Sequence, residues 1–265
     1  MGQIPNWIGD FSALGTLILS RNYLDGAMQT GFCKLNKLRF LDFSHNKIGP
    51  TLPPNANLTN MKFLHWESNE LIGPIPQALA KATSLVTLNL RDNKLSSPIP
   101  HWMSLLSKLR VFLLKGNQLE DSIPLHLCQL KSTNVLDLSH NHLSESIPHC
   151  LDNMTFGREV ALKDDTFSMD RFWTLWGGSP KPYSYENQLS VLVDMDFNLF
   201  TSTESEEIEF ITKSRSESYM GDILYFMSGL DLSRNKLTSA IPSEIGNLNG
   251  IHTLNLSYNQ TRSIP

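Results

Sequence analysis

Residues 88–100 read LNLRDNKLSSPIP, a pattern from which the architecture of the whole chain can be predicted. Leu88 and Leu90 alternate with polar residues, which predicts a short strand with both leucines on one side. Asn93 follows where the chain turns, and its amide can bond the backbone of its own coil and of the adjacent coil. Further apolar residues precede a closing Ile-Pro. One such coil cannot bury its own apolar face, so the stretch predicts copies of itself.

The copies are present in a regular register. Their turn asparagines are 23 or 24 residues apart, except for one gap of 94 residues. These asparagines are Asn22, Asn46, Asn69, Asn93, Asn117, Asn141, Asn235 and Asn259. The first inward residues of the strands are Leu17, Leu41, Leu64, Leu88, Phe112, Leu136, Leu230 and Leu254. This is the pattern of a leucine-rich repeat, and the long gap exceeds the usual spacing by 70 residues, so one coil carries an insertion.

The repeats predict an α/β-type repeat solenoid, an arc with a parallel concave β-sheet of about eight short strands. We expect about six coils over residues 1–154, with the first incomplete, an island over 155–223 and two further coils over 224–265. The coil of Leu230 should stack directly on the coil of Leu136. The island is expected to be a small folded lobe, because aromatic residues are followed by alternating stretches such as residues 208–212.

Composition excludes several classes of protein. The chain is 40% hydrophobic and 18% charged with a net charge of −4, which argues against disorder and against nucleic-acid or lipid partners. No run of 18 apolar residues occurs, so no membrane insertion by this chain is expected. No phosphate-binding loop or catalytic set is found, which predicts a protein that is not an enzyme and needs no cofactor. The lack of a leader and of terminal caps predicts an excerpt of a longer solenoid or a truncated gene product.

The cysteines indicate no disulfide framework. Cys33 and Cys128 share a column four coils apart, which is beyond disulfide reach. Cys128 and Cys150 lie in adjacent coils but two residues out of phase, so a bridge stays open, although the sequence favours buried free thiols. We interpret the nearby histidines as a scattered, solvated set and not a metal site; they are His140, His142 and His149.

A glycine in the LxGxIP pattern is retained only in early coils, as Gly26 and Gly73. Later coils carry other residues at this position: Ser97, Asp121, Glu145 and Ser239. If the position requires positive φ, each replacement costs stability, because only glycine adopts that conformation freely. Trp66 occupies an inward slot and is interpreted as a large core residue.

The outward strand positions form the concave face, where solenoids usually bind. Its apolar members could make an exposed stripe for a protein partner or could be ordinary cross-strand packing. Its polar members suit hydrogen bonding to a peptide or glycan. The candidate binding residues are Phe40, Phe63, His65, Asn89, Arg91, Val111, Leu113, Asp137 and Asp231.

Four Asn-x-Ser/Thr sequons offer glycosylation sites if the chain is secreted. Asn57, Asn153 and Asn255 are predicted acceptors. Asn259 is a turn asparagine whose amide should be buried, so we predict that it stays unmodified.

The coils LDLSHNHLSESIP at 136–148 and LDLSRNKLTSAIPSEIGNLNGIHTLNLSYN at 230–259 closely resemble plant-type extracellular leucine-rich repeats. The interruption resembles the island domain of plant receptor-like proteins, the cell-surface receptors that lack a kinase. Lys213 and Tyr219 match the Lys-x5-Tyr island motif of that family, although Ser214 stands where the family usually has glycine.

The resemblance implies an ectodomain at the plasma membrane that binds a protein, peptide or glycan ligand and signals in defence or development through a receptor-kinase co-receptor. We hypothesise that Lys213 and Tyr219 hold the exit of the island near Asp137 and Asp231. Two alternatives remain: a secreted inhibitor similar to the polygalacturonase-inhibiting proteins, and a truncated non-functional or decoy product.

Overall fold

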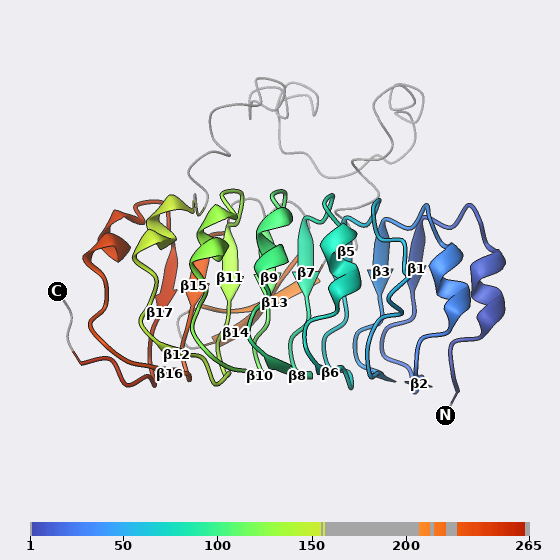
Figure 1. The fold of residues 1–265 in the computed structure, drawn as a ribbon, viewed down its shortest axis with the longest axis horizontal. Helices are drawn as coiled ribbons and strands as arrows, with labels where there is room; N and C mark the ends of the chain where they lie inside the picture. The colour runs from blue at the N-terminus through green and yellow to red at the C-terminus, as the bar shows by residue number, and fades with distance from the viewer. Residues whose placement is uncertain (1, 155, 157–206, 213–214, 221–226, 263–265) are drawn as a thin grey trace, which may run out of the picture. The chain divides into compact units, whose positions relative to one another are not determined.

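The computed structural model describes residues 2–154, 156, 207–212, 215–220 and 227–262. Eight parallel strands stand side by side in chain order and form the largest sheet (Figure 1). They are β1 (Thr16–Ile18), β3 (Phe40–Asp42), β5 (Phe63–His65), β7 (Thr87–Asn89), β9 (Val111–Leu113), β11 (Val135–Asp137), β15 (Gly229–Asp231) and β17 (Thr253–Asn255).

The register of this sheet confirms the predicted solenoid. Leu17 pairs with Leu41, Leu64 with Leu88, and so on through every predicted inward residue to Leu254. β11 pairs directly with β15, so the coil of Leu230 stacks on the coil of Leu136 as predicted. The long gap is therefore an insertion between two coils that would otherwise be ordinary neighbours.

Each coil returns through a second short strand and, in most coils, a five-residue 3-10 helix on the opposite side from the large sheet. The short strands are β2 (Asp25–Gly26), β4 (Lys47–Ile48), β6 (Ile72–Gly73), β8 (Lys94–Ser97), β10 (Gln118–Leu119), β12 (Ser144–Glu145) and β16 (Lys236–Leu237). The 3-10 helices are η1 (Asn6–Asp10), η2 (Thr30–Lys34), η3 (Gln77–Lys81), η4 (His101–Leu105), η5 (Leu125–Gln129), η6 (His149–Asn153) and η7 (Ser243–Asn247). We call the side that carries these helices the convex side.

The leucine positions form one continuous hydrophobic core along the coils. Trp66 is fully buried, which confirms that it is a core residue, and its ring meets Phe43 edge-on at 5.6 Å between centroids. Thr133 replaces an apolar residue of the repeat but is also buried, and its hydroxyl donates to the Leu109 carbonyl at 2.9 Å. The hydrogen bond offsets the cost of burying that hydroxyl.

The turn asparagines connect neighbouring coils as predicted. The Asn93 amide nitrogen donates to the Trp66 carbonyl of the preceding coil at 2.8 Å and to the Leu90 carbonyl of its own coil at 3.2 Å. Its side-chain oxygen accepts the backbone N–H of Leu71 at 3.0 Å. Because the side chain is buried, each of these bonds satisfies a polar group that water cannot reach.

Two columns of residues adopt positive φ. The first is the LxGxIP position, where Gly26 and Gly73 have φ of 76° and 73°. The residues that replace glycine there keep the same conformation: Ser97, Asp121, Glu145 and Ser239, at φ of 63–78°. The position therefore has positive φ in every one of these coils, which is the condition under which each replacement of glycine was predicted to cost stability.

The second column was not anticipated from the sequence. It is the residue before each turn asparagine, and its members have φ of 51–70°. They are Arg21, His45, Ser68, Asp92, Gly116, His140, Arg234 and Tyr258. Only one of them is glycine, so the sequence carries no compositional signal of this left-handed turn.

The chain divides into two compact units, residues 1–156 with 227–265, and residues 157–226. In the second unit the described residues form an antiparallel pair, β13 (Glu207–Thr212) and β14 (Arg215–Met220). A strand was predicted for residues 208–212, and β13 confirms it. No helix in the described part of the chain is long and apolar enough to span a bilayer.

Candidate functional site on the concave face

The concave face consists of the first and third side chains of each strand in the large sheet. The strand pairing aligns them in two columns, one from Thr16 to Thr253 and one from Ile18 to Asn255. The predicted binding residues therefore come together on adjacent strands: Phe40, Phe63 and Val111 in the first column, and His65, Asn89, Leu113, Asp137 and Asp231 in the second. Arg91 follows two residues after Asn89.

The aromatic part of this face is packed. Phe40 lies 6.0 Å from Phe63 and stacks on His65 at 5.6 Å, measured between ring centroids. These two phenylalanines, Val111 and Leu113 are at most 5% exposed, whereas Ile18 at the end of the column is 50% exposed. The structure thus places the apolar members in cross-strand packing rather than in an exposed stripe.

Two carboxylates lie side by side in the polar part. Asp137 and Asp231 occupy paired positions on β11 and β15, and both are buried. The Asp137 carboxylate accepts hydrogen bonds from the Ser139 backbone N–H at 3.0 Å and hydroxyl at 2.6 Å. Burial, together with the negative charge of Asp231, raises the pKa of Asp137 to about 6 despite these bonds. Asp231 accepts from the Ser233 N–H and from the Asn255 amide at 3.0 Å.

A second polar group lies around His65. Burial, with a smaller contribution from Arg91, lowers the pKa of His65 to about 4, and burial raises the pKa of Glu67 to about 7. In the described part of the chain, the Glu67 Oε2, Thr87 Oγ1 and Asn89 Nδ2 atoms are buried without a hydrogen-bond partner. Buried groups of this kind carry a desolvation cost that a polar partner would remove.

The island motif is only partly described. Lys213 lies outside the described residues, so its predicted position near Asp137 and Asp231 stays a hypothesis. Tyr219 lies on β14, where it pairs with Ile208 of β13.

The sequons differ in how their amides are engaged. Asn57 and Asn153 are exposed, and the Asn57 side-chain oxygen accepts from the Thr59 hydroxyl at 2.9 Å. The Asn255 amide nitrogen already donates to Asp231. The Asn259 amide is half-buried and donates to the Leu232 carbonyl of the preceding coil at 2.9 Å, as its role as a turn asparagine requires.

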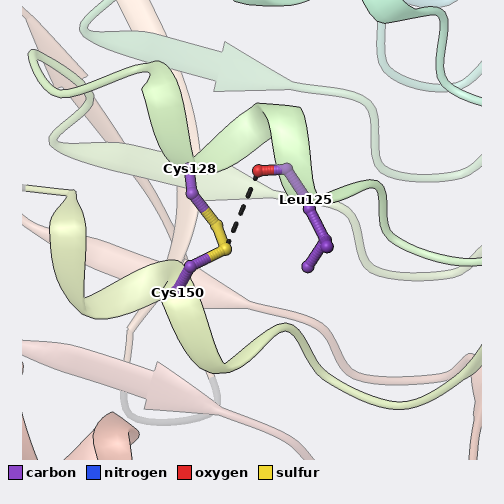
Figure 2. The surroundings of a disulfide bond; sticks show 3 residues. All are labelled: Leu125, Cys128 and Cys150. Atoms are coloured by element: carbon purple, nitrogen blue, oxygen red, sulfur yellow. Dashed lines mark hydrogen bonds between the residues drawn. A yellow bond between two sulfur atoms is a disulfide. The ribbon is translucent and has the colours of Figure 1, made fainter.

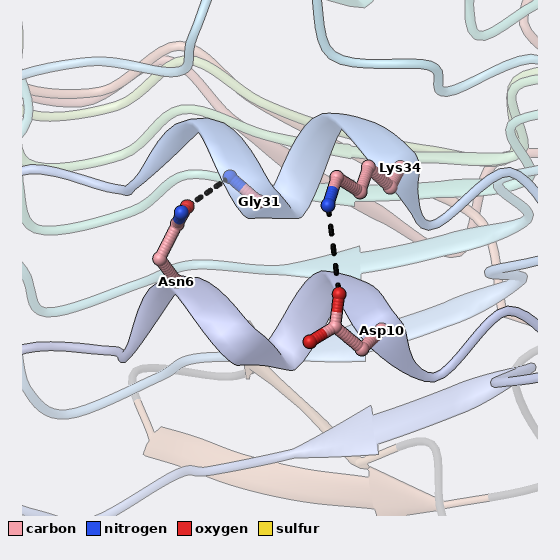
Figure 3. A network of polar contacts seen from close by, with 4 residues as sticks. All are labelled: Asn6, Asp10, Gly31 and Lys34. Atoms are coloured by element: carbon pink, nitrogen blue, oxygen red, sulfur yellow. Dashed lines mark hydrogen bonds and ion pairs between the residues drawn. The ribbon is translucent and has the colours of Figure 1, made fainter.

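Away from the concave face, side chains link consecutive 3-10 helices on the convex side. Figure 3 shows η1 and η2 joined by two contacts. The Asn6 side-chain oxygen accepts the Gly31 backbone N–H at 2.6 Å, and Lys34 lies 3.5 Å from Asp10. The ion pair is exposed and contributes little, but the amide bond helps to hold the two coils in register.

A disulfide joins Cys128 on η5 to Cys150 on η6, so the expectation of buried free thiols at these two positions was wrong (Figure 2). The two Cα atoms are 5.8 Å apart, within the disulfide range of about 4.4–6.8 Å. A two-residue offset corresponds to only about 4 Å along a 3-10 helix, which the two side chains span. The Cys150 sulfur also lies 3.7 Å from the Leu125 carbonyl oxygen, and Cys33 is the free cysteine.

Family profiles described as "Leucine Rich Repeat" match residues 84–106, 132–154 and 227–248, and a second leucine-rich-repeat profile matches residues 34–51. Receptor-like protein 13 of Arabidopsis thaliana is 37% identical over 107 residues, which are 40% of this chain and 10% of that relative. Cuscuta receptor 1 of Solanum lycopersicum is 47% identical over 57 residues, 22% of this chain and 5% of the relative. The alignments therefore span a tenth or less of these relatives.

Solved plant ectodomains have the same fold. The plant peptide hormone receptor RGFR1 in complex with RGF2 superposes with a TM-score of 0.69 at 22% identity, covering 98% of this chain and 31% of that one. The Arabidopsis receptor kinase HAESA, in complex with the peptide hormone IDA and the co-receptor SERK1, gives 0.67 at 22% identity, covering 98% and 32%. The chain therefore contains leucine-rich repeats, and parts of its sequence are similar to plant receptor-like proteins.

Proposed function

We propose that this chain is a ligand-binding portion of the ectodomain of a plant cell-surface receptor-like protein, without catalytic activity of its own. The observation that carries the proposal is the sequence similarity to receptor-like proteins, found on a solenoid whose concave face holds an aromatic group beside two polar groups. The chain would act at the extracellular face of the plasma membrane and signal in defence or development through a receptor-kinase co-receptor.

The ligand class that fits this face best is an extended peptide. A peptide presents backbone donors and acceptors at short intervals, which suits a row of His65, Asn89 and Asp137 on successive or near-successive strands. Solved neighbours are described in complex with peptide hormones, which makes a secreted peptide fraction the appropriate probe.

The test uses the full-length receptor that contains this chain, expressed in leaf cells and exposed to a fractionated apoplastic peptide extract. Recruitment of a receptor kinase and calcium influx are recorded, with surface abundance measured separately. We expect Asn89→Ala to abolish the response at normal abundance. His142→Ala, an exposed substitution away from the concave face, is the control and should respond like the wild type.

The proposed role of the island motif is tested in the same cells with Lys213→Ala combined with Tyr219→Ala. We expect a reduced response at unchanged abundance. An unchanged response would remove these two residues from ligand sensing. A wild-type receptor that recruits no kinase with any peptide fraction would overturn the receptor proposal itself and would favour an inhibitor or decoy.

A further inference from the structure

Two histidines face each other on the convex side, well away from the concave face. His101 is the first residue of η4 and His126 is the second residue of η5, so they come from consecutive coils. Their ring centroids are 4.8 Å apart, and their two Nδ1 atoms are 3.3 Å apart. His101 is exposed and His126 is half-buried, so an ion from solvent can reach both nitrogens.

The backbone determines which His126 nitrogen is available. The His126 Nε2 atom lies 3.0 Å from the Pro100 carbonyl oxygen, which can only accept a hydrogen bond. Nε2 therefore carries the proton, and the lone pair of the neutral ring lies on Nδ1, directed toward His101. This is the arrangement of metal-binding histidines, in which one ring nitrogen donates to a backbone carbonyl while the other binds the metal.

We propose that His101 and His126 form a two-histidine Zn²⁺ site that links η4 to η5 through their Nδ1 atoms. Two nitrogens bound to one tetrahedral Zn²⁺ at about 2.0–2.1 Å lie about 3.3–3.4 Å from each other. The observed separation of 3.3 Å matches this edge, and without metal it also allows a hydrogen bond between the two rings. Imidazole is a ligand suited to Zn²⁺.

The site supplies two ligands, and water fills the other two positions. No group of three or more metal-ligating side chains occurs among the residues that the structure describes, which is consistent with an open site of modest affinity.

Bound Zn²⁺ would extend an existing series of links between coils. η5 is already joined to η6 by the Cys128–Cys150 disulfide, and Asn247 of η7 donates to Asp152 of η6 at 3.2 Å. A Zn²⁺ bridge from η4 to η5 would continue this series toward the N-terminus. Because the metal binds only when both coils are in register, it stabilises the folded solenoid over the unfolded chain.

The test is isothermal titration of the untagged full chain with ZnCl₂ at pH 7.5, with the wild type compared against His101→Ala and His126→Ala. We expect the wild type to bind one equivalent of Zn²⁺. Each variant should bind Zn²⁺ with an affinity that is weaker by a factor of about ten or more. His149→Ala is the matched control, because His149 is the exposed first residue of η6 and has the same position in its helix as His101. It should bind Zn²⁺ like the wild type.

A thermal unfolding series distinguishes the metal site from a simple hydrogen-bonded pair. Zn²⁺ should raise the Tm of the wild type and of His149→Ala but not that of His101→Ala or His126→Ala. MgCl₂ should leave every Tm unchanged, since Mg²⁺ prefers oxygen ligands. Equal Zn²⁺ affinity in the wild type and either pair variant, or loss of binding in His149→Ala, would overturn the proposal.

Discussion

The Asn235 side-chain amide donates a hydrogen bond of 2.9 Å to the Leu138 carbonyl, 97 residues earlier in the chain. The same bond joins Asn141 to Leu114 over 27 residues in an uninterrupted part of the solenoid. The asparagine ladder therefore continues across the insertion without a change in geometry. Loop-closure cost rises only slowly with loop length, so an insertion of 70 residues leaves this contact intact.

Asn235→Ala should destabilise the solenoid by about 1–3 kcal/mol, because it leaves the buried Leu143 N–H without its partner and removes one of the two amide bonds to the Leu138 carbonyl. Urea unfolding measures the loss, and faster hydrogen exchange at Leu143 localises it. Asn22→Ala is the control: Asn22 is exposed and bonds only to carbonyls of its own coil. Equal losses in the two variants would contradict the role of the ladder.

Glu145→Gly should stabilise the chain by up to about 1 kcal/mol, because Glu145 has φ of 63° and glycine adopts that conformation without steric cost. Ser146→Gly, one residue further on, should destabilise it, since that residue lacks positive φ and glycine adds only unfolded-state entropy. Thermal unfolding of both variants checks the pair. A lower Tm for Glu145→Gly would show that the strain at this position is negligible.

Loss of the disulfide should cost about 3 kcal/mol, the chain-entropy estimate for a bridge between residues 22 apart. We expect this loss in Cys128→Ser combined with Cys150→Ser, measured by denaturant unfolding without reductant. Cys33→Ser should be nearly neutral because Cys33 is unbridged and half-buried. Non-reducing peptide mapping of the secreted chain provides a direct check, and a free thiol at Cys128 would contradict the bridge.

Asp137→Asn should change how stability depends on pH. The folded pKa of Asp137 is raised from 3.8 to about 6, so the folded state holds this proton more tightly than the unfolded chain does. The stability that the protonated Asp137 contributes to the wild type is therefore present at low pH and is lost as pH rises from about 4 through about 6. Asparagine does not ionise and retains an oxygen that accepts from Ser139.

The stability of Asp137→Asn relative to the wild type should therefore increase by about 2 kcal/mol between pH 4 and pH 7. Each unit of pKa shift corresponds to about 1.4 kcal/mol, and most of the shift at Asp137 falls within this pH range. Urea unfolding of both proteins at several pH values measures the difference. Contributions from His65 and Glu67 are common to both proteins and do not enter it. Parallel curves for the two proteins would contradict a raised pKa at Asp137.

Glycan mapping after secretion from a plant host should find Asn57 occupied and Asn259 bare. Asn57 is exposed, whereas the Asn259 amide is bonded to the Leu232 carbonyl. Asn255 should be occupied less than Asn57, because glycan attachment would compete with its bond to Asp231. Asp231→Ala should raise the occupancy of Asn255. Full occupancy of Asn259 would be incompatible with its place in the ladder.

The repeat register, and the direct stacking of the coil of Leu230 on the coil of Leu136, could be predicted from the local sequence pattern alone. Each coil repeats one local pattern, and alternate residues of a strand point to opposite sides. The spacing of Leu88, Leu90 and Asn93 therefore places the strand, the core and the turn without knowledge of the neighbours. The predicted site columns follow from the same alternation, because identical coils align identical positions.

The environment of each position, in contrast, depends on how the coils pack in three dimensions. The burial of Phe63 and Asp137, and with it the raised pKa of the carboxyl, depends on what surrounds the face and not on the local pattern. The Cys128–Cys150 bridge depends on distances between two helices, which a count of residues along the chain does not measure. The His101–His126 pair was missed for the same reason: it joins side chains 25 residues apart whose approach is a property of two packed coils.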